Sequence, residues 1–440
     1  MSSESKLQLL LLSIGAVLVS PLYYLGDGGL FSEIVFYLLL SAGTILLGVY
    51  LTKNPDIALS PSYVFGSTIL LYLVTIPHGI FIDTELYRHI WDGLIQNEGE
   101  NPYAYTPLSE AWFGMRGHEV FQHLKEPRFY SASAPVEMVF HRFLAWLEPV
   151  AGLNGLIIAY KLFAILSGLG VIWLLLKLLG SDDVIPSHVL LFAWNPVILL
   201  MIAGQGTLDN LAVLSVLGII YFMDHEQQEI MPMFWGISMH LTLLTWILLP
   251  WLIYRVRWSY MLIALGTWAV WWLPFFSSDV LLNYFNGLIA YHLYPASSAT
   301  FGYLLIELFS HLYSGSEQWI YATLVIGFAA YIILRGRPYS GYDSYQIITP
   351  VFLIAILLWV VLPNFSTGLL ATCIALGVLD TRLRFYIPIL SVMIVPQIIA
   401  LRLDEWAWIP ALINSFILVS AGFYLYITRK QNGSLAADVR

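Results

Sequence analysis

The sequence predicts an all-α polytopic integral membrane protein with about 13 membrane segments. Hydrophobic residues make up 59% of its 440 residues and charged residues only 11%, whereas a soluble domain carries about 25% charged residues. Apolar runs close to the roughly 20 residues that cross a bilayer recur along the chain. They lie at about 7–25, 32–51, 61–81, 152–179, 186–203, 207–223, 232–254, 258–276, 318–334, 345–362, 366–381, 385–401 and 407–428. We therefore expect a single membrane domain over residues 1–440.

The run from Met231 to Tyr254 carries two polar residues, His240 and Thr242, near its middle. Each half has about 11 residues, which as helix covers about 16 Å or half a bilayer. We predict a re-entrant or broken pair here, because it places the later arginines on the cytoplasmic side. One plain crossing is the alternative.

Positive residues collect at the cytoplasmic ends of spans, and Lys6, Lys53 and Lys177 set the orientation. The resulting topology has both termini in the cytoplasm and two extracytoplasmic loops, 82–150 and 277–317. We expect a multi-pass protein of the cell membrane, or of the endoplasmic reticulum in a eukaryote. The run at 7–25 is expected to be a retained signal anchor.

The net charge and the cysteine content argue against a nucleic-acid partner and an intrachain disulfide. The net charge of −9 argues against a nucleic-acid partner. The one cysteine, Cys373, leaves no intrachain disulfide to form.

The first loop, 82–150, holds ten acids, five bases and many aromatic residues. From Thr84 to Asn97 its apolar residues recur at helical spacing, which predicts an amphipathic helix in the outer membrane interface. These apolar residues are Leu86, Ile90, Leu94 and Ile95, and the opposite face carries Arg88, Asp92 and Gln96. Turn residues between Gly99 and Pro107 exclude helix there.

Two acids, Asp83 and Glu85, stand where the third apolar run ends and this helix begins. One of two neighbouring carboxylates can have a raised pKa and accept a proton from an attacking hydroxyl. The alternative is that they cap the helix, since acids are favourable in its first turn. Both interpretations stay open from the spacing alone.

Two sets of motifs follow. The loop reads Tyr87-Arg88-His89-Ile90-Trp91-Asp92-Gly93 and then Gly99-Glu100-Asn101-Pro102-Tyr103; further on come Ala193-Trp194-Asn195-Pro196, Ala203-Gly204-Gln205-Gly206 and Asp209. Over about residues 80–275 the chain thus resembles the GT-C superfamily of glycosyltransferases, particularly the mannosyltransferases that use polyprenyl- or dolichyl-phosphate mannose. The resemblance implies a GT-C-like fold and a lipid-phosphate sugar donor.

On this resemblance Asp83 and Glu85 are the candidate catalytic residues. The candidates for binding the phosphate or sugar of the donor are Arg88, Asp92, Asn101, Tyr103, Arg128, Gln205, Asp209 and His240. Arg88 and Arg128 can bind phosphate bidentately, with interface snorkelling or pairing to Glu85 as the alternative. Asp209 can instead cap a helix, and His240 can instead be a packed, hydrogen-bonded core residue.

The expected reaction is inverting transfer of a hexose, mannose in the family, to an acceptor hydroxyl on the extracytoplasmic side. A loop carboxylate would act as base. The expected partners are the prenyl-phosphate sugar, a glycan or lipid acceptor, and membrane lipid. No metal is required and no metal site is expected, although a divalent cation is compatible with the reaction. A transporter or flippase of lipid-linked saccharides is the rival interpretation, and a structural membrane subunit is a third.

Overall fold

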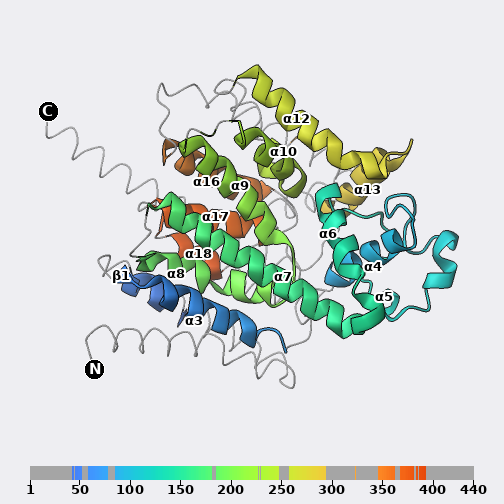
Figure 1. The fold of residues 1–440 in the computed structure, drawn as a ribbon, viewed down its shortest axis with the longest axis horizontal. Coiled ribbons are helices and arrows are strands. Elements are labelled where there is room, and N and C mark those ends of the chain that lie inside the picture. Colours follow the sequence, from blue (N-terminus) through green and yellow to red (C-terminus); the bar gives the residue numbers. More distant parts are fainter. Residues whose placement is uncertain are drawn as a thin grey trace, which may run out of the picture.

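A computed structural model of the chain describes residues 42–51 except 44, 58–77, 85–180, 185–246 except 226 and 228, 257–293, 323, 345–361, and 367–392 except 381, 382 and 385. Helices provide nearly all of the regular structure in these ranges (Figure 1). The predictions for the two termini, for the runs at 7–25 and 407–428, and for most of the second loop lie outside the described residues.

A helical body includes α7 (Glu148–Leu178), the longest described helix, which packs along α9. Its other members are α3 (Pro61–Val74), η3 (Ser187–Val189), α8 (Leu190–Ala193), the π-helix η4 (Val197–Ala203), α9 (Asp209–Asp224), α10 (Met231–Leu241), α16 (Tyr345–Val361), α17 (Thr367–Leu379) and α18 (Tyr386–Val392). One large hydrophobic core joins these elements, as their continuous apolar sequences require. Two short antiparallel strands, β1 (Ala58–Leu59) and β2 (Ile185–Pro186), link the start of α3 to the start of η3.

The prediction of about 13 membrane segments is wrong for the described part of the chain. Within it, α7 alone is long and apolar enough to cross a membrane, or two spans exist if a pair bent by 102° counts as one. That pair runs from Trp258 to Phe275 and from Val280 to Tyr291. One or two such helices are weak grounds for a membrane protein, because core helices of soluble proteins can have the same composition.

The overcount has a physical cause, since hydropathy measures composition and not the continuity of a helix. The run at 61–81 contains α3, which has 14 residues and covers about 21 Å. The run at 232–254 is interrupted at Thr242, whose extended backbone ends α10. The run at 258–276 gives only the 15 residues of α12 (Trp258–Trp272) before the chain tightens into a 3-10 turn.

The segment from residue 85 to 147 forms a smaller group of helices at one end of the body (Figure 1). It contains α4 (Glu85–Asn97), the 3-10 helix η2 (Glu110–Met115), α5 (Glu119–Gln122) and α6 (Pro135–Ala145). α4 lies along α6 and approaches it closely at Gly93, where a Cβ atom would come within 2.4 Å of the His141 carbonyl oxygen. This group has a core of its own, built around Ile90, Trp91 and Leu144 and completed by Leu156 and Tyr160 of α7.

A third, aromatic core fastens the smaller group to α12 (Trp258–Trp272), η5 (Leu273–Phe275) and α13 (Val280–Leu293). Tyr103 lies at its centre, with ring centroids 5.4 Å from Phe275, 5.8 Å from Tyr284 and 5.9 Å from Trp272. The segment 99–107 is not helical and carries Tyr103 into this core.

A helix does occupy residues 85–97, and its apolar positions are buried. Its polar face differs from the expectation, because Asp92 and Gln96 are buried too. Gln96 donates hydrogen bonds to the Asp92 and Met138 carbonyl oxygens at 3.1 and 2.9 Å. Thus α4 is covered on both faces by protein and does not present its polar side to a membrane interface.

Candidate functional site

The first turn of α4 carries the candidate base that the structure describes. The Tyr291 hydroxyl of α13 donates a 3.3 Å hydrogen bond to Glu85 Oε2, on an exposed part of the molecule. Asp83 lies outside the described residues. Glu85 therefore stands where α4 and α13 meet, and it also occupies the first-turn position that favours an acid.

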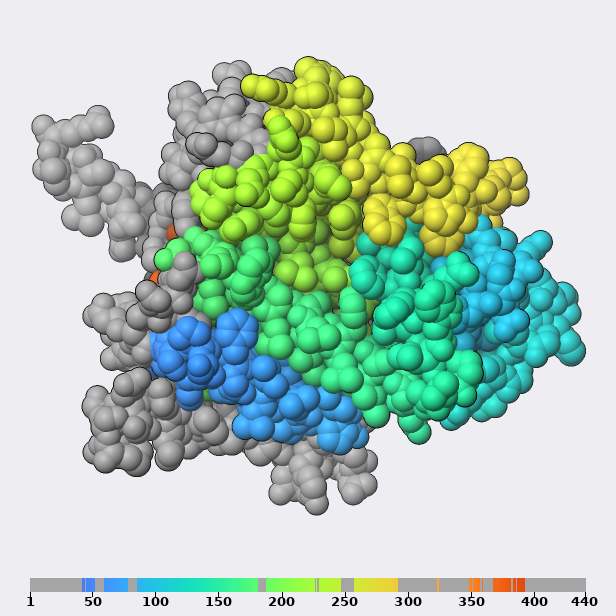
Figure 2. All heavy atoms as spheres, in the orientation of Figure 1, coloured from blue at the N-terminus to red at the C-terminus, as the bar shows by residue number. Residues whose placement is uncertain are grey.

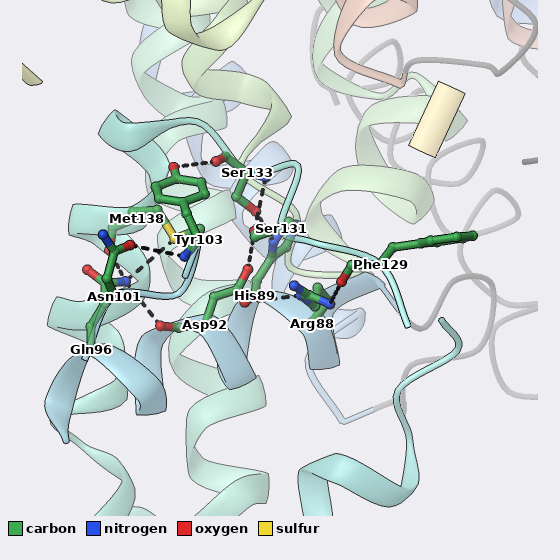
Figure 3. Close-up of polar contacts among 10 residues, drawn as sticks. All are labelled: Arg88, His89, Asp92, Gln96, Asn101, Tyr103, Phe129, Ser131, Ser133 and Met138. Carbon is green, nitrogen blue, oxygen red and sulfur yellow. Dashed lines mark hydrogen bonds and ion pairs between the residues drawn. The ribbon is translucent and has the colours of Figure 1, made fainter. Parts of the chain in front are cut away.

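Arg88 and Asp92 form an ion pair one turn further along α4 (Figure 3). Arg88 Nε donates to Asp92 Oδ1 at 3.0 Å, and Nη1 donates to the Phe129 carbonyl oxygen at 3.0 Å. The third nitrogen, Nη2, is buried and has no acceptor among the described residues. Arg88 thus keeps one unused donor in a half-buried position.

Asp92 is 1% exposed, and both of its oxygens accept hydrogen bonds. Oδ1 accepts from Arg88, and Oδ2 accepts from the Ser131 hydroxyl at 2.5 Å (Figure 3). Burial raises the pKa of the Asp92 carboxyl, against the opposing effects of Arg88 and Ser131. This arrangement favours a role for Asp92 in orienting Arg88 over a role in direct contact with a substrate.

Two imidazoles lie stacked between α4 and α6. The ring centroids of His89 and His141 are 4.5 Å apart with an interplanar angle of 15°. His89 Nδ1 lies 3.1 Å from Ser133 Oγ, and His141 Nδ1 lies 3.1 Å from the Tyr160 hydroxyl. Burial lowers the pKa of His89 to about 4, with a further contribution from Arg88, and lowers the pKa of His141 well below its usual value. Both rings are therefore neutral near pH 7.

Asn101 and Tyr103 are brought together, but as parts of the aromatic core. Asn101 Oδ1 accepts from the Tyr103 amide at 3.0 Å, and its Nδ2 donates to the Phe275 carbonyl oxygen at 2.8 Å. Tyr103 has no exposed surface, and its hydroxyl donates to the Ser133 carbonyl oxygen at 2.7 Å (Figure 3). These contacts favour a structural role for this motif.

Asp209 lies where α9 and α17 begin. Its Oδ2 accepts from the Thr207 hydroxyl at 2.8 Å and from the Thr367 hydroxyl. A Cβ atom at Gly368 would come within 2.8 Å of Asp209 Oδ1. A carboxylate is favourable at a helix N-terminus, so the charge of Asp209 suits the first turn of α9, although the N-cap residue of this helix is Leu208.

Three other predicted binding residues remain: Arg128, which precedes the Phe129 that binds Arg88, and Gln205 and His240, which belong to other parts of the fold. Arg128 is exposed and pairs with Glu126 at 3.0 Å. Gln205 is 1% exposed, inside the turn before α9. His240 Nε2 lies 2.9 Å from the Trp268 carbonyl oxygen, and its ring stacks on Trp268, which agrees with the packed alternative.

The motif Ala193–Pro196 stabilises the helical body through the hydrogen bonds of Asn195. Asn195 Nδ2 donates to the Leu191 carbonyl oxygen at 3.1 Å and to the Ser391 hydroxyl at 2.7 Å, and Oδ1 accepts from the Val197 amide at 3.0 Å. The motif therefore joins α8, η4 and α18.

Sequence reasoning missed Glu137, the half-buried acid near the start of α6. Its Oε2 accepts from the Ala134 amide at 2.8 Å. Burial raises the pKa of the Glu137 carboxyl to about 7, against the effect of the Ala134 amide and reinforced by the charge of Asp209. An acid three residues after a possible N-cap looks like an ordinary cap in sequence, and its approach to Asp209 is visible only in three dimensions.

Ser131, Ser133 and His141 were missed as well, because their partners on α4 are 39, 44 and about 50 residues away in sequence. A Ser-Ala-Ser segment between two helices gives no signal of its own. No group of three or more His, Cys, Asp or Glu residues suited to a metal ion occurs within the described ranges.

Comparisons with known proteins do not assign the chain to a class. No protein-family model matches it, and neither the curated proteins nor the solved structures give a significant match.

Proposed function

We propose that the chain is a hexosyltransferase that uses a polyprenyl-phosphate-linked sugar as donor. The observation that carries this proposal is the placing of Glu85 and Arg88 three residues apart on the first turn of α4, where Tyr291 of α13 reaches Glu85. Residues three apart on a helix lie on the same side, with Cβ atoms about 5–6 Å apart. A carboxylate and a guanidinium at this spacing fit the two demands of a phosphosugar donor, a base for the incoming hydroxyl and a cation for the departing phosphate.

The chemistry balances with these two groups. Glu85, or Asp83 just before it, takes the proton of an acceptor hydroxyl, and the oxygen attacks the anomeric carbon. The bond from that carbon to the phosphate oxygen breaks, and the prenyl phosphate leaves with the electron pair. Inversion follows from attack on the face opposite the leaving group. The unused Nη2 of Arg88 donates to the leaving phosphate, where a charge-assisted hydrogen bond stabilises the developing charge.

In this proposal Asp92 orients Arg88, and Ser131 holds Asp92 through its hydrogen bond. Because Asp92 holds Nε and the Phe129 carbonyl holds Nη1, the guanidinium plane is fixed before donor binds. A hydrogen-bond donor that is already oriented spends little free energy on reorganisation during the reaction, and such preorganisation is the main source of electrostatic stabilisation in enzymes. We thus propose Asp92 as a positioning residue and Arg88 as the phosphate ligand.

A lipid-linked donor also requires an enzyme that works at a membrane. The overall composition, with mean hydropathy +0.77, and the span-length helix α7 are compatible with this. The bent pair α12–α13 keeps a transporter of lipid-linked saccharides as the second candidate, because broken helices are common at transporter binding sites.

The test is turnover. Purified full-length protein is incubated with a labelled prenyl-phosphate hexose and a panel of glycan and lipid acceptors, and new glycosidic product is scored by mass spectrometry. Glu85→Gln or Asp83→Asn, whichever removes the base, should lower the rate by about 10²–10⁴. Full rates in both variants would end the assignment of the base.

Arg88 and Arg128 provide a matched pair. Arg88→Gln should raise the donor KM and lower kcat, whereas Arg128→Gln, which changes an exposed arginine of the same segment, should leave both unchanged. If no acceptor gives product while the protein moves the labelled donor across vesicle bilayers, the transporter interpretation replaces this one.

A further inference from the structure

The end of α6 and the first turn of α7 present large apolar side chains to the outside. Five of them occur between residues 139 and 150: Val139, Phe143, Trp146, Leu147 and Val150. We call these five residues the junction stripe. Phe143 is 58% exposed, Trp146 59% and Val150 93%.

Within α6, Val139 and Phe143 are four residues apart and so lie on the same face. Trp146 and Leu147 form the turn that leads from α6 into α7. The opposite side of α6 is buried through Met138, His141, Leu144 and Ala145. Hence the inner face of α6 packs against α4, which carries the candidate site, and its outer face presents apolar side chains.

A water-exposed face of this kind is unusual in a soluble protein. Single exposed apolar residues are common, but contiguous large ones mark a surface that is covered in use. The stripe itself contains no acid; its charged neighbours in sequence are the exposed Arg142 and the half-buried Glu148. Figure 2 shows the α6–α7 junction, in teal green, on the open face of the molecule with no grey atoms over it.

The apolar exposure does not stop at the junction. It continues along α7 through Ile158, Leu162, Leu166 and Trp173, and α7 is the described helix with the length and composition of a membrane span. Gly152, with φ of 63°, separates the junction from the rest of α7. Such a backbone turn lets the short segment before it take a different direction from the long helix after it.

We infer that the junction stripe docks the 85–147 segment onto a lipid bilayer, with the stripe in the boundary between headgroups and acyl chains. Phe and Trp are the side chains that suit this boundary, and Arg142 on its edge can pair with a lipid phosphate. The continuity with α7 favours lipid over a second copy of the chain as the covering partner. This docking face belongs to α6 and α7, and not to α4, whose polar face is buried. The inference concerns attachment and holds whether or not a hexose is transferred.

Site-directed spin labels test it on the full chain. Single cysteines are introduced as Phe143→Cys and Val150→Cys in a Cys373→Ser background, and the protein is reconstituted into bilayers of phosphatidylcholine and phosphatidylglycerol. Collisions with oxygen, which concentrates in acyl chains, are compared with collisions with a water-soluble nickel chelate. Phe113→Cys is the matched control, because Phe113 is 69% exposed on η2 of the same segment but lies outside the stripe.

We expect the ratio of oxygen to nickel accessibility at residues 143 and 150 to exceed that at residue 113 severalfold. Equal accessibility to nickel at all three positions would overturn the inference. Protection from both reagents at 143 and 150 would also overturn it, because protein would then cover the stripe. Melting temperatures equal to that of the Cys373→Ser protein show that the labelled variants are folded.

Discussion

The Tyr291 hydroxyl donates a 3.3 Å hydrogen bond to Glu85 Oε2 and so ties α13 to the first turn of α4 across 206 residues of chain. The Tyr291–Glu85 pair could serve only to stabilise the fold, or Glu85 could be a catalytic base, and the two roles predict different effects of substitution. If Glu85 is the base, Tyr291→Phe should lower kcat by less than tenfold, because one partly exposed hydrogen bond contributes about 1 kcal/mol. Glu85→Gln should cost far more. Initial rates of both variants with a saturating donor measure the difference.

The control for this prediction is stability. Both variants should melt within a few degrees of the parent protein, since the contact is exposed. Equal losses of activity in the two variants, accompanied by equal losses of melting temperature, would favour a structural tie and remove Glu85 from the reaction.

Gly93 should tolerate no side chain. A Cβ atom there would meet the His141 carbonyl oxygen at 2.4 Å and Ala145 Cβ at 2.9 Å, so Gly93→Ala forces α4 away from α6. Overpacking of this kind typically costs about 1–3 kcal/mol. Gly114→Ala is the matched control, because a Cβ atom at Gly114 meets nothing within 4 Å. Denaturant unfolding that ranks the two variants equally would contradict the close packing of α4 on α6.

Acid should weaken the protein through the stacked histidines. Burial lowers the pKa of His89 from its ordinary 6.5 to about 4, so the unfolded chain binds more protons between these values. The stabilising contribution of the neutral ring is therefore present above about pH 6.5 and is lost as pH falls toward 4. For His89 the loss is at most about 3 kcal/mol. As pH falls from 6.5 to 4, His89→Gln should lose less free energy of unfolding than the parent, so the difference between the two proteins should change over this range.

Glu137 should act in the opposite direction over nearly the same range. Its pKa is raised from 4.5 to about 7, so the native state holds the proton more tightly, and stability falls as pH rises from 4.5 to 7. Glu137→Gln can still accept from the Ala134 amide but does not ionise. As pH rises from 4.5 to 7, the free energy of unfolding of Glu137→Gln should increase relative to that of the parent by up to about 3 kcal/mol. A constant difference between the two proteins would show that Glu137 titrates near its ordinary value.

Because the two effects oppose each other, the parent protein should show a flatter pH dependence than either variant. Asp209→Asn offers a check, since removal of its charge should shift the titration of Glu137 downward. Carboxyl titration followed by infrared difference spectroscopy measures this without any enzyme assay.

Local features were accessible from the sequence. The spacing of Leu86, Ile90, Leu94 and Ile95 gives the helix and its buried face, because helical periodicity depends on neighbours only three or four residues away. The burial of Asp92 was not accessible, since it depends on Ser131 at a distance of 39 residues. A polar residue on a helix looks solvent-facing until its partner is known.

The same limit explains the membrane segments and the site. Hydropathy does not show that Pro274 follows α12 in a 3-10 turn. The polar residues His240 and Thr242, in contrast, did indicate the break at which α10 ends. The motif containing Asn101 and Tyr103 could be located in sequence, but its role in the aromatic core depends on Phe275. Glu137 looked like a cap, and only its nearness to Asp209 makes it unusual.

The bond from Asn101 to the Phe275 carbonyl has a consequence for biosynthesis. These residues are 174 positions apart, so at about 5–20 residues per second the ribosome needs roughly ten to thirty seconds to supply the partner. During that interval Tyr103 and Met138 have no aromatic core to enter, and this part of the nascent chain keeps an apolar surface open to water. Nascent chains stalled before residue 275 should therefore be cleaved by protease around Tyr103, whereas the completed and released chain should be protected there. A chaperone that binds extended aromatic segments would find its substrate in that window, and the finished protein would no longer offer it.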